Sequence, residues 1–386
     1  MTNNENNTAN QARKIEIVTV RTHRQKKQFV DLQYKLYRDN PYWAPPFRMD
    51  ELNMMDAKKN PAMENCDAEW FLAIRDGEVV GRVGGIIHRG VNEKWNRKSV
   101  RFTRIDFIDD EEVSRALTGA VEEWGKSRGM TEAQGPLGFS DLDFEGMLVE
   151  GFDEMSTFVT IYNYPYYPKH LEKLGYKKDT DWVEYQITVP EQPDKRVEKI
   201  AKMISERYGF KLVEVDSRTE LVKNWAQPLF EVLIDAYSPL YGTAPLTKRE
   251  INSIISQFIT FLNPDFVKLV VDKDNKLAAF GICYPSLTEA ARKSKGNLLP
   301  FGIFRFLRAM KHNDKLEMLL VGVLPEHQGK GLNAILMDAI TKTAMRYGIR
   351  MAESNPELED NQKVQALWKF YETRQHRRRR AYVKPL

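Results

Sequence analysis

The sequence predicts an α+β fold that consists of two similar domains. The 386 residues exceed the usual size of a single hydrophobic core, so more than one domain is expected. Two strand–turn–strand patterns, at residues 68–87 and 266–283, carry glycines at equivalent points, Gly81 and Gly281. Each pattern follows a mainly helical region and precedes a strand, a helix and another strand. This repeated order predicts two copies of one domain.

Local signals mark the elements of the first copy. The dipeptide Asp76-Gly77 joins two runs rich in β-branched and aromatic residues, which is a strong hairpin signal. Residues 100–107 and 111–128 then supply the expected strand and helix.

The second copy continues in the same order. Residues 316–323 are strand-like, and residues 332–347 repeat apolar side chains at the spacing of one helix face. Lys342 and Arg346 near the end of this pattern, with Gly348 after it, are typical of a helix C-terminus.

A proline-rich polar segment, VPEQPD at residues 189–194, separates the two copies. It predicts one domain over residues 13–190 and another over residues 191–386, after a disordered tail over residues 1–12. The first 190 residues hold 26 Lys and Arg against 31 Asp and Glu, a net charge of −5, and the rest hold 32 against 23, a net of +9. An anionic ligand is therefore expected to prefer the second copy.

Composition argues against several classes of protein. No apolar run approaches the roughly 18 residues of a membrane span, and the N-terminal residues lack the pattern of a signal peptide. The two cysteines, Cys66 and Cys283, lie far apart in the sequence, which suggests a reducing compartment and a cytoplasmic location. The six histidines show no ligand spacing, so no metal is expected.

The loop QGKGLN at residues 328–333 has the features of an anion site. Glycines before a helix leave backbone N–H groups and the positive end of the helix dipole facing outward, where phosphate commonly binds. The Walker and dinucleotide-binding patterns do not fit, because Leu332 follows Gly331 and Ala334 stands where a third glycine is required. A β-to-α turn without a ligand is the alternative.

This loop, after an apolar strand that ends in VLPE at residues 323–326, resembles the motif [QR]-x-x-G-x-[GA] of the GNAT superfamily of acyl-CoA-dependent N-acyltransferases. The resemblance implies two tandem GNAT-like domains, each a mixed, mostly antiparallel sheet flanked by helices. It implies that loop amides hold the pyrophosphate of acetyl-CoA or a longer acyl-CoA, while the strand holds the pantetheine arm. The residues so assigned are Val321, Val323, Gln328, Gly329, Lys330, Gly331, Leu332 and Asn333, the last of which departs from the usual Gly or Ala.

The resemblance also suggests a general acid. Asn361 matches the Asn with which the family caps a helix beside the cofactor. The Tyr that follows it after seven residues in the family is Trp368 here, and Tyr371, one helical turn further, is the candidate substitute.

Glu317 is the candidate base. It precedes Gln328 by eleven residues, the spacing of the catalytic Glu in histone-acetylating members of the family. Strand alternation predicts that it shares one face with residues 319, 321 and 323. Asp314 is a weaker rival, and a solvated carboxylate at a strand end is the alternative for Glu317.

The first copy lacks the glycine loop. Its equivalent segment carries Asp109, Asp110, Glu111 and Glu112 at the helix start, where they fill and repel the place of a pyrophosphate. The copy closes with LEKLGY at residues 171–176, which resembles a common GNAT ending. We therefore expect a degenerate GNAT-like domain that does not bind coenzyme A.

Residues 286–315 form a long insertion in the second copy. Apolar side chains at positions 303, 306, 307 and 310 follow helical spacing, while basic residues fall on the other faces. Such a helix lies on an anionic membrane, covers an acyl tunnel or packs on its own domain, and the first option predicts peripheral contact with the inner membrane through residues 298–312. Four arginines at residues 377–380 resemble the last GNAT strand with its charges on the solvated side, so no nucleic-acid partner is expected.

Segments such as NPYWAPPF at residues 40–47 resemble a bacterial family of tandem GNAT-like proteins, and the match covers nearly all residues after about 13. The expected function is acyl-CoA-dependent N-acyl transfer, in the first instance acetyl transfer, to a small-molecule or lipid amine. The alternatives are a long-chain acyltransferase that acts on an amino lipid, like bacterial ceramide-forming enzymes of GNAT type, and a non-catalytic acyl-CoA-binding protein. Residues 135–167 either border the acceptor pocket or form a structural connection.

Overall fold

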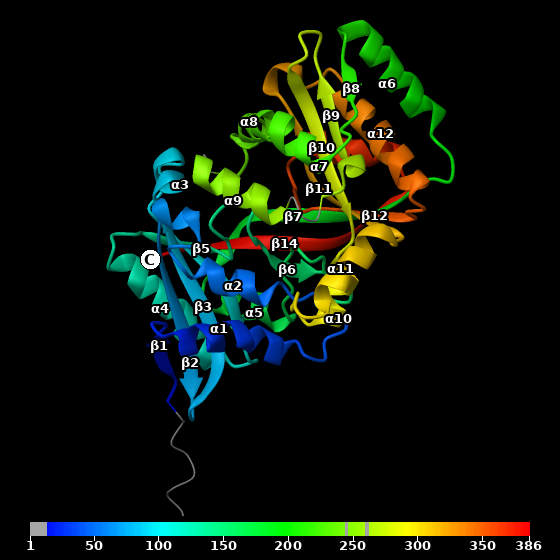
Figure 1. The fold of residues 1–386 in the computed structure, drawn as a ribbon. Helices are drawn as coiled ribbons and strands as arrows, with labels where there is room; N and C mark the ends of the chain where they lie inside the picture. The colour runs from blue at the N-terminus through cyan, green and yellow to red at the C-terminus, as the bar shows by residue number, and fades with distance from the viewer. Residues whose placement is uncertain (1–13, 244–245, 259–261) are drawn as a thin grey trace, which may run out of the picture.

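A single mixed sheet of fourteen strands organises the protein. The computed structural model describes residues 14–243, 246–258 and 262–386, so the predicted tail over residues 1–12 lies outside the described residues. The main path of the sheet runs β1-β2-β3-β4-β5-β14-β7-β12-β11-β10-β9-β8, and β6 and β13 pair beside it. Helices lie on both sides of the sheet (Figure 1). The predicted α+β class and the mixed sheet are confirmed.

The first half contains seven strands. The strands are β1 (Glu16–Thr19), β2 (Cys66–Arg75), β3 (Glu78–His88), β4 (Ser99–Phe107), β5 (Glu132–Gly135), β6 (Met147–Glu150) and β7 (Lys177–Thr188). The helices are α1 (His23–Leu36), α2 (Arg48–Met54), η1 (Pro61–Glu64), α3 (Arg89–Lys94), α4 (Glu111–Lys126) and α5 (Tyr166–Lys173).

The second half repeats this order with extra helices. The strands are β8 (Lys211–Val213), β9 (Val267–Val271), β10 (Leu277–Pro285), β11 (Lys315–Val323), β12 (Met351–Ser354), β13 (Glu357–Leu358) and β14 (Thr373–Pro385). The helices are α6 (Lys195–Tyr208), α7 (Arg218–Glu220), η2 (Leu221–Trp225), α8 (Ala226–Tyr237), α9 (Lys248–Phe258), η3 (Pro264–Phe266), α10 (Thr288–Ser294), α11 (Gly302–Lys311), η4 (Pro325–His327), α12 (Leu332–Arg346), α13 (Gln362–Gln365) and η5 (Ala366–Phe370).

Each half contributes one strand to the sheet of the other. β14, at the end of the chain, lies between β5 and β7 of the first half, and its pairing with β7 spans residues 373–383. β7 in turn lies between β14 and β12, and so completes the second half. Figure 1 shows β14 and β7 crossing the middle of the molecule together. The sheet is continuous because of this exchange.

The exchanged strands carry a buried ionic network. Arg377 and Arg379 of β14 are 1% and 0% exposed, and both donate to the carboxylate of Glu184 on β7. Arg377 also donates to Glu353 of β12 over 2.8 Å. The prediction of charges on a solvated side is therefore wrong for these two arginines, because the segment between β6 and α5 covers their face, where the carbonyls of Met155 and Ile161 accept from them. Their charges are matched by carboxylates from other strands.

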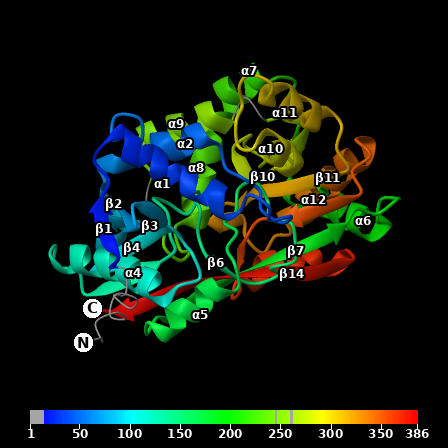
Figure 2. The same cartoon turned by 90° about the horizontal axis from the view of Figure 1, so that it is seen from below.

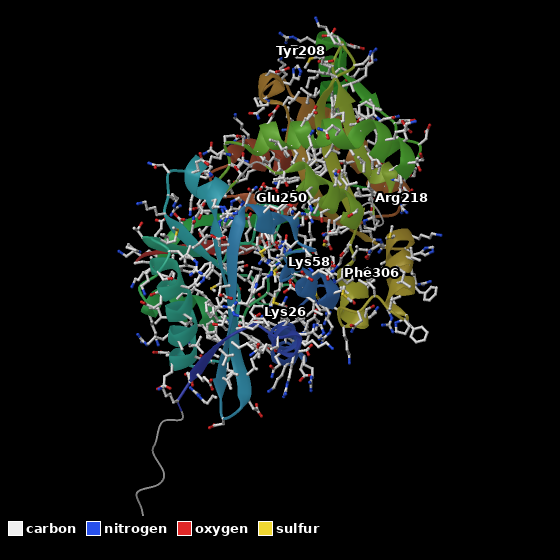
Figure 3. All side chains as sticks on the ribbon, turned by 60° about the vertical axis from the view of Figure 1, so that its left-hand side comes forward. Lys26, Lys58, Tyr208, Arg218, Glu250 and Phe306 are labelled. Carbon is white, nitrogen blue, oxygen red and sulfur yellow. The ribbon has the colours of Figure 1, made fainter. Side chains whose placement is uncertain are left out.

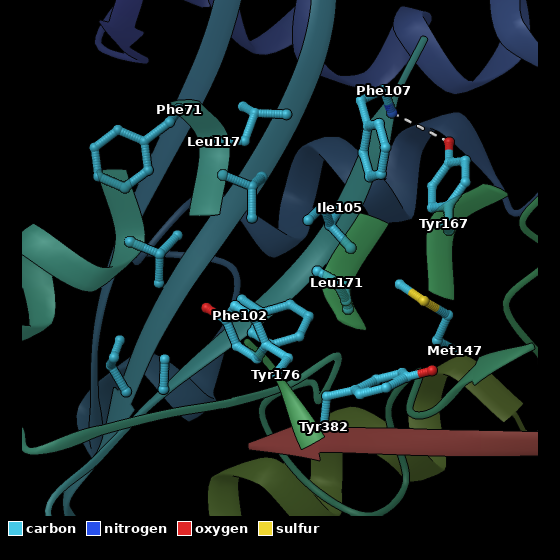
Figure 4. Close-up of a cluster of buried hydrophobic side chains, with 14 of the residues drawn as sticks. Phe71, Phe102, Ile105, Phe107, Leu117, Met147, Tyr167, Leu171, Tyr176 and Tyr382 are labelled. Carbon is cyan, nitrogen blue, oxygen red and sulfur yellow. Dashed lines mark hydrogen bonds between the residues drawn. The ribbon is translucent and has the colours of Figure 1, made fainter. Parts of the chain in front are cut away.

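The hydrophobic core of the first half lies between its strands and helices α4 and α5. Figure 4 shows the aromatic part of this core, where Phe107 stacks on Tyr167 with ring centroids 4.3 Å apart. The Tyr167 hydroxyl accepts a 3.1 Å hydrogen bond from the backbone N–H of Phe107. Tyr382 of β14 belongs to the same cluster, so the end of the chain helps to build the core of its beginning.

Candidate active site

The loop before α12 presents unpaired backbone donors. Gly329 and Gly331 have φ angles of +78° and +84°, a conformation that suits glycine and turns successive N–H groups to one side. Within the described part of the chain, the N–H groups of Gly329, Gly331, Leu332 and Asn333 have no hydrogen-bond acceptor. No side chain caps α12 either. Four free donors at the positive end of a fifteen-residue helix form a site that fits a phosphate or pyrophosphate.

Neighbouring side chains hold the loop in place. The Gln328 amide donates to the carbonyl of Val323 over 3.3 Å and accepts from Lys363 over 3.2 Å. Lys330 lies 3.1 Å from the ring nitrogen Nδ1 of His327. These contacts place two ammonium groups beside the loop and add positive charge at the candidate phosphate site.

The strands β11 and β12 begin as a parallel pair and then separate. Pairing joins residues 315–318 to residues 351–354 and stops there. Asn355 then turns toward β11, donating from its backbone N–H to Met318 over 3.2 Å and from its side chain to Leu319 over 3.0 Å. The Val321 carbonyl accepts a 3.1 Å hydrogen bond from the Tyr237 hydroxyl. The edge of β11 after Leu319 therefore faces a gap instead of a neighbouring strand.

A bulge accompanies this separation. Ile282 of β10 lies opposite Leu320, but the next residue, Cys283, lies opposite Met318. Leu319 is the extra residue and has no partner in β10. Bulges of this kind bend a strand and change which face its side chains occupy.

The bulge contradicts the predicted common face of residues 317, 319, 321 and 323. Met318 packs against the cluster that contains Met337 and Ile340 of α12, and Val321 packs against a second cluster from the same helix. Met318 and Val321, three positions apart, therefore lie on the same side of β11. In a regular strand they would lie on opposite sides. Glu317 points instead toward α10, so it is not on the side of Val321.

A cavity of about 270 Å³ adjoins the gap. The second half lines it with residues 318–321, the start of α12, helices α8 and α9, and residues 354–358. The first half lines it with residues 141–145, residues 159–160 and Trp182. Part of the segment 135–167 therefore borders the cavity. Of the two roles expected for this segment, this position fits the border of a pocket. Most of the lining is apolar and includes Leu229, Phe230, Ile255, Leu319, Leu336 and Met337.

Residues 226–371 match the model of the acetyltransferase (GNAT) family. The second half of the chain therefore carries a GNAT-like domain. The matched residues include the glycine loop and the two separating strands. They also include most of the cavity-lining residues that come from the second half of the chain. Members of this family transfer an acyl group from acyl-CoA to an amine.

Comparison with whole proteins extends the likeness to the full chain. Protein YghO of Escherichia coli K12 is 27% identical over 371 residues, which are 93% of each chain. A bacterial ceramide synthase of Caulobacter vibrioides is 28% identical over 359 residues, which cover 90% of this chain and 91% of that protein. A solved tandem GNAT protein from the clavulanic acid biosynthesis pathway has a TM-score of 0.54 at 15% identity, over 96% of this chain and 98% of its own. The tandem GNAT fold is thus confirmed.

The first GNAT-like half has its loop position closed by a side chain. Asp110 caps α4, and its carboxylate accepts from the N–H groups of Glu112 and Val113 over 2.9 and 3.3 Å. Arg75 neutralises Asp110 at 2.8 Å. The helix donors that an anion needs are therefore already occupied.

Glu317, the predicted base, lies next to the cavity wall and does not line the cavity. It is 5% exposed, and its carboxylate accepts from the hydroxyls of Tyr284, Ser286 and Thr288 over 2.7, 2.5 and 3.1 Å. Burial raises the pKa of Glu317. Three hydroxyl donors favour a structural link between β11 and α10, and the base role stays a prediction.

The predicted residues Asn361 and Tyr371 differ in their position relative to the cavity. Asn361 lines the cavity and caps α13, accepting from the N–H of Val364 over 3.4 Å. Tyr371 does not line the cavity, and its hydroxyl lies 3.1 Å from that of Thr341 on α12. Burial raises the pKa of Tyr371. The acid role of Tyr371 also stays a prediction.

Sequence reasoning missed the carboxylates that do line the cavity. Glu357 follows β12 and accepts from the indole Nε1–H of Trp368 over 3.0 and 3.2 Å, and burial raises its pKa to about 8. Glu145 and Asp141 of the first half line the cavity as well. Burial raises the pKa of both, and the neighbouring Asp141 adds to the shift of Glu145. The one sequence signal for Asp141 and Glu145 was their position inside the segment 135–167.

The described residues form neither a metal-binding cluster nor a membrane-spanning helix. No group of three or more His, Cys, Asp and Glu side chains could hold a metal ion within residues 14–243, 246–258 and 262–386. Over the same ranges, none of the helices combines the length and the apolarity that crossing a bilayer requires.

Proposed function

We propose that the protein transfers a long acyl chain from acyl-CoA to the amine of an amino lipid. The observation that carries this proposal is the mostly apolar cavity beside the glycine loop, which adjoins the gap between β11 and β12. Apolar walls stabilise an alkyl chain by about 0.8 kcal/mol for each buried CH₂ group. An acetyl group gains little from such walls. Long-chain transfer, an alternative at the level of the sequence, is therefore better supported than acetyl transfer.

The donor is expected to enter along β11. The free N–H groups of the loop would hold the pyrophosphate, and Val321 with Val323 would line the pantetheine arm. Asn333 and Asn361 stand at the cavity end of this path. The bulge opens the sheet at the point where the thioester would lie, so the acyl chain extends into the cavity.

Glu357 is our candidate for the base that accepts the amine proton. In the reaction the amine nitrogen attacks the thioester carbonyl carbon, the C–S bond breaks, coenzyme A leaves as thiolate and the amine proton passes to the base. Glu357 lines the cavity two residues after Asn355, which contacts β11. Its pKa of about 8 suits a base near neutral pH, and the Trp368 indole orients its carboxylate.

The first half supplies the opposite wall. Asp141 and Glu145 are carboxylates, and a protonated amine head group is attracted by such groups before it loses its proton. The proposed role of the degenerate half is therefore to bind the acceptor and not the donor. An amino lipid resides in a bilayer, so the reaction is proposed to take place at a membrane surface, with residues 298–312 as the contact.

Release of free thiol from acyl-CoA tests the proposal. We expect turnover with long-chain acyl-CoA and a long-chain amino alcohol in detergent to exceed turnover with acetyl-CoA and soluble amines. The variant Ile255→Trp narrows the cavity and should lower long-chain turnover about tenfold while acetyl-CoA binding is unchanged. Met203→Trp, on the exposed surface of α6, is the matched control. Binding of acyl-CoA without any thiol release would overturn the enzymatic proposal, and equal use of acetyl-CoA would overturn the chain length.

A further inference from the structure

The insertion between β10 and β11 exposes a group of large apolar side chains. Leu299, Phe301, Phe304 and Leu307 are 78%, 70%, 67% and 44% exposed. They make up four of the twelve large apolar side chains that are exposed in the described part of the chain. We call these four residues the insertion patch. Singly exposed apolar residues are common, but four within nine positions form a contiguous feature that water solvates poorly.

The insertion patch is not the face with which α11 packs on the protein. Phe306 and Met310 form that face, at 0% and 8% exposed. Phe306, labelled in Figure 3, contacts two rings of the first half. Its ring centroid lies 5.0 Å from that of Phe47 and 6.2 Å from that of Phe158. The predicted apolar stripe that joined positions 306 and 307 is therefore divided, because Leu307 points outward. The inner face already stabilises the helix, and the insertion patch is left for another contact.

Positive charge surrounds the insertion patch. Residues 290–313 contain six Lys and Arg and no Asp or Glu. Arg292 and Lys293 pair with Glu289, at 3.3 and 3.9 Å. The other four cations, Lys295, Arg305, Arg308 and Lys311, have no ion-pair partner in the described ranges. A negatively charged apolar surface would match both features.

We propose that the insertion patch docks the protein on the anionic surface of a lipid bilayer. The aromatic and leucine side chains would enter the interfacial region, and the cations would contact lipid phosphates. Helices α10 and α11 lie at the margin of the molecule next to β10 and β11 (Figure 2), so they can approach a flat surface. The charge complementarity selects a bilayer over an apolar protein partner.

The docking site is connected to the candidate active site. Leu319 packs against the cluster that holds Phe306 and Met310, and it also lines the cavity. When the protein is docked, the cluster that holds Phe306 and Met310 therefore lies between the lipid surface and the cavity wall at Leu319. The link to catalysis rests on the proposed function, whereas membrane binding itself rests on the surface alone.

Co-sedimentation of the full chain with vesicles tests the proposal. The protein should bind vesicles that contain phosphatidylglycerol, bind vesicles of phosphatidylcholine alone more weakly, and lose the difference at high salt. The double variant Phe301→Ser/Phe304→Ser should reduce binding about tenfold or more. The double variant Arg308→Glu/Lys311→Glu should remove the preference for phosphatidylglycerol. The matched control Met203→Ser/Leu212→Ser alters two exposed apolar side chains elsewhere and should bind like the unaltered protein.

Each outcome has a defined meaning. Equal vesicle binding by the unaltered protein and the Phe301→Ser/Phe304→Ser variant, at equal melting temperature, would overturn the proposal. A sedimentation velocity that changes from dimer to monomer in that variant, without vesicle binding, would assign the patch to a second copy of the chain instead. Thiol release with a soluble amine acceptor reports on the proposed function separately. A variant that loses vesicle binding but keeps this soluble activity supports docking whatever the natural acceptor is.

Discussion

The assignment of Glu357 as the base leads to a prediction in which activity and stability change in opposite directions. Replacement by Gln keeps the shape and the acceptor for the Trp368 indole but removes the titratable group. If Glu357 accepts the amine proton, turnover should fall on the order of 10²–10⁴-fold. The proposed donor site lies on other residues, so the affinity for acyl-CoA should change little.

The pH dependence follows from the shifted pKa. The base acts when ionised, so activity should rise with pH and reach half its plateau near pH 8, the pKa to which burial raises Glu357. In the Glu357→Gln variant this rise of activity with pH should be absent. For stability the sign is reversed, because a folded-state pKa above the unfolded value of about 4.5 makes ionisation unfavourable in the folded protein. The cost is absent below pH 4.5 and complete above pH 8.

The pKa difference sets the size of this cost. A shift from 4.5 to about 8 corresponds to at most about 5 kcal/mol. Water that enters the cavity screens the carboxylate, so we expect about 1–2 kcal/mol. Urea unfolding at pH 5 and pH 9 should therefore show Glu357→Gln to be more stable than the unaltered protein only at the higher pH. The control Glu317→Gln should lose stability at both, because three hydroxyl donors there face the replaced group.

The reasoning is refuted if Glu357→Gln keeps its turnover and its pH profile. If Glu317→Gln loses both in the same assays, Glu317 is the base and its hydroxyl network serves catalysis. Loss of turnover in both variants with an unchanged pH limb would leave Asp141 and Glu145 as the groups that titrate.

Three further predictions concern the donor loop, the ionic network and the insertion. Gly331→Glu should abolish coenzyme A binding in calorimetry, because its φ is +84° and a Cβ would lie 2.4 Å from a neighbouring side chain, whereas Gly329→Ala, with a φ of +78° but no heavy atom near the added Cβ, should weaken binding and keep the single site per chain. Glu184→Gln should lower the free energy of unfolding by about 3–5 kcal/mol, measured in urea, since it leaves two buried guanidinium groups without their shared anion. Phe306→Ser should cost about 3–5 kcal/mol in the same measurement and Phe304→Ser less than about 0.5 kcal/mol, because only the first side chain is buried.

Local signals in the sequence predicted the local elements well. The turn at Asp76-Gly77 has φ angles of 54° and 81°, and the helix predicted over residues 332–347 spans residues 332–346. The glycine loop likewise depends on residues that are adjacent in the chain. Periodicity, turn residues and helix ends report on interactions within about ten residues, and these predictions needed no more than that.

The features that failed depend on contacts between distant residues. The bulge at Leu319 arises where β10 and β11 meet, and nothing in the alternation of β11 announces it. Arg377 and Arg379 read as solvated because their partner Glu184 lies more than 190 positions earlier. Glu145 and Glu357 reach one cavity from opposite halves, which no spacing rule brings together.

The exchange of β7 and β14 explains why the first half cannot be dispensable. A chain that began at residue 191 would lack β7, so β12 and β14 would lose the strand that joins them. Arg377 and Arg379 would lose Glu184, so Arg377 would keep only Glu353 and the buried charge of Arg379 would be unpaired. Trp182 and residues 141–145 would be missing from the cavity wall. The first half is therefore part of the structure of the second, because it completes the sheet, neutralises its centre and lines one part of the cavity.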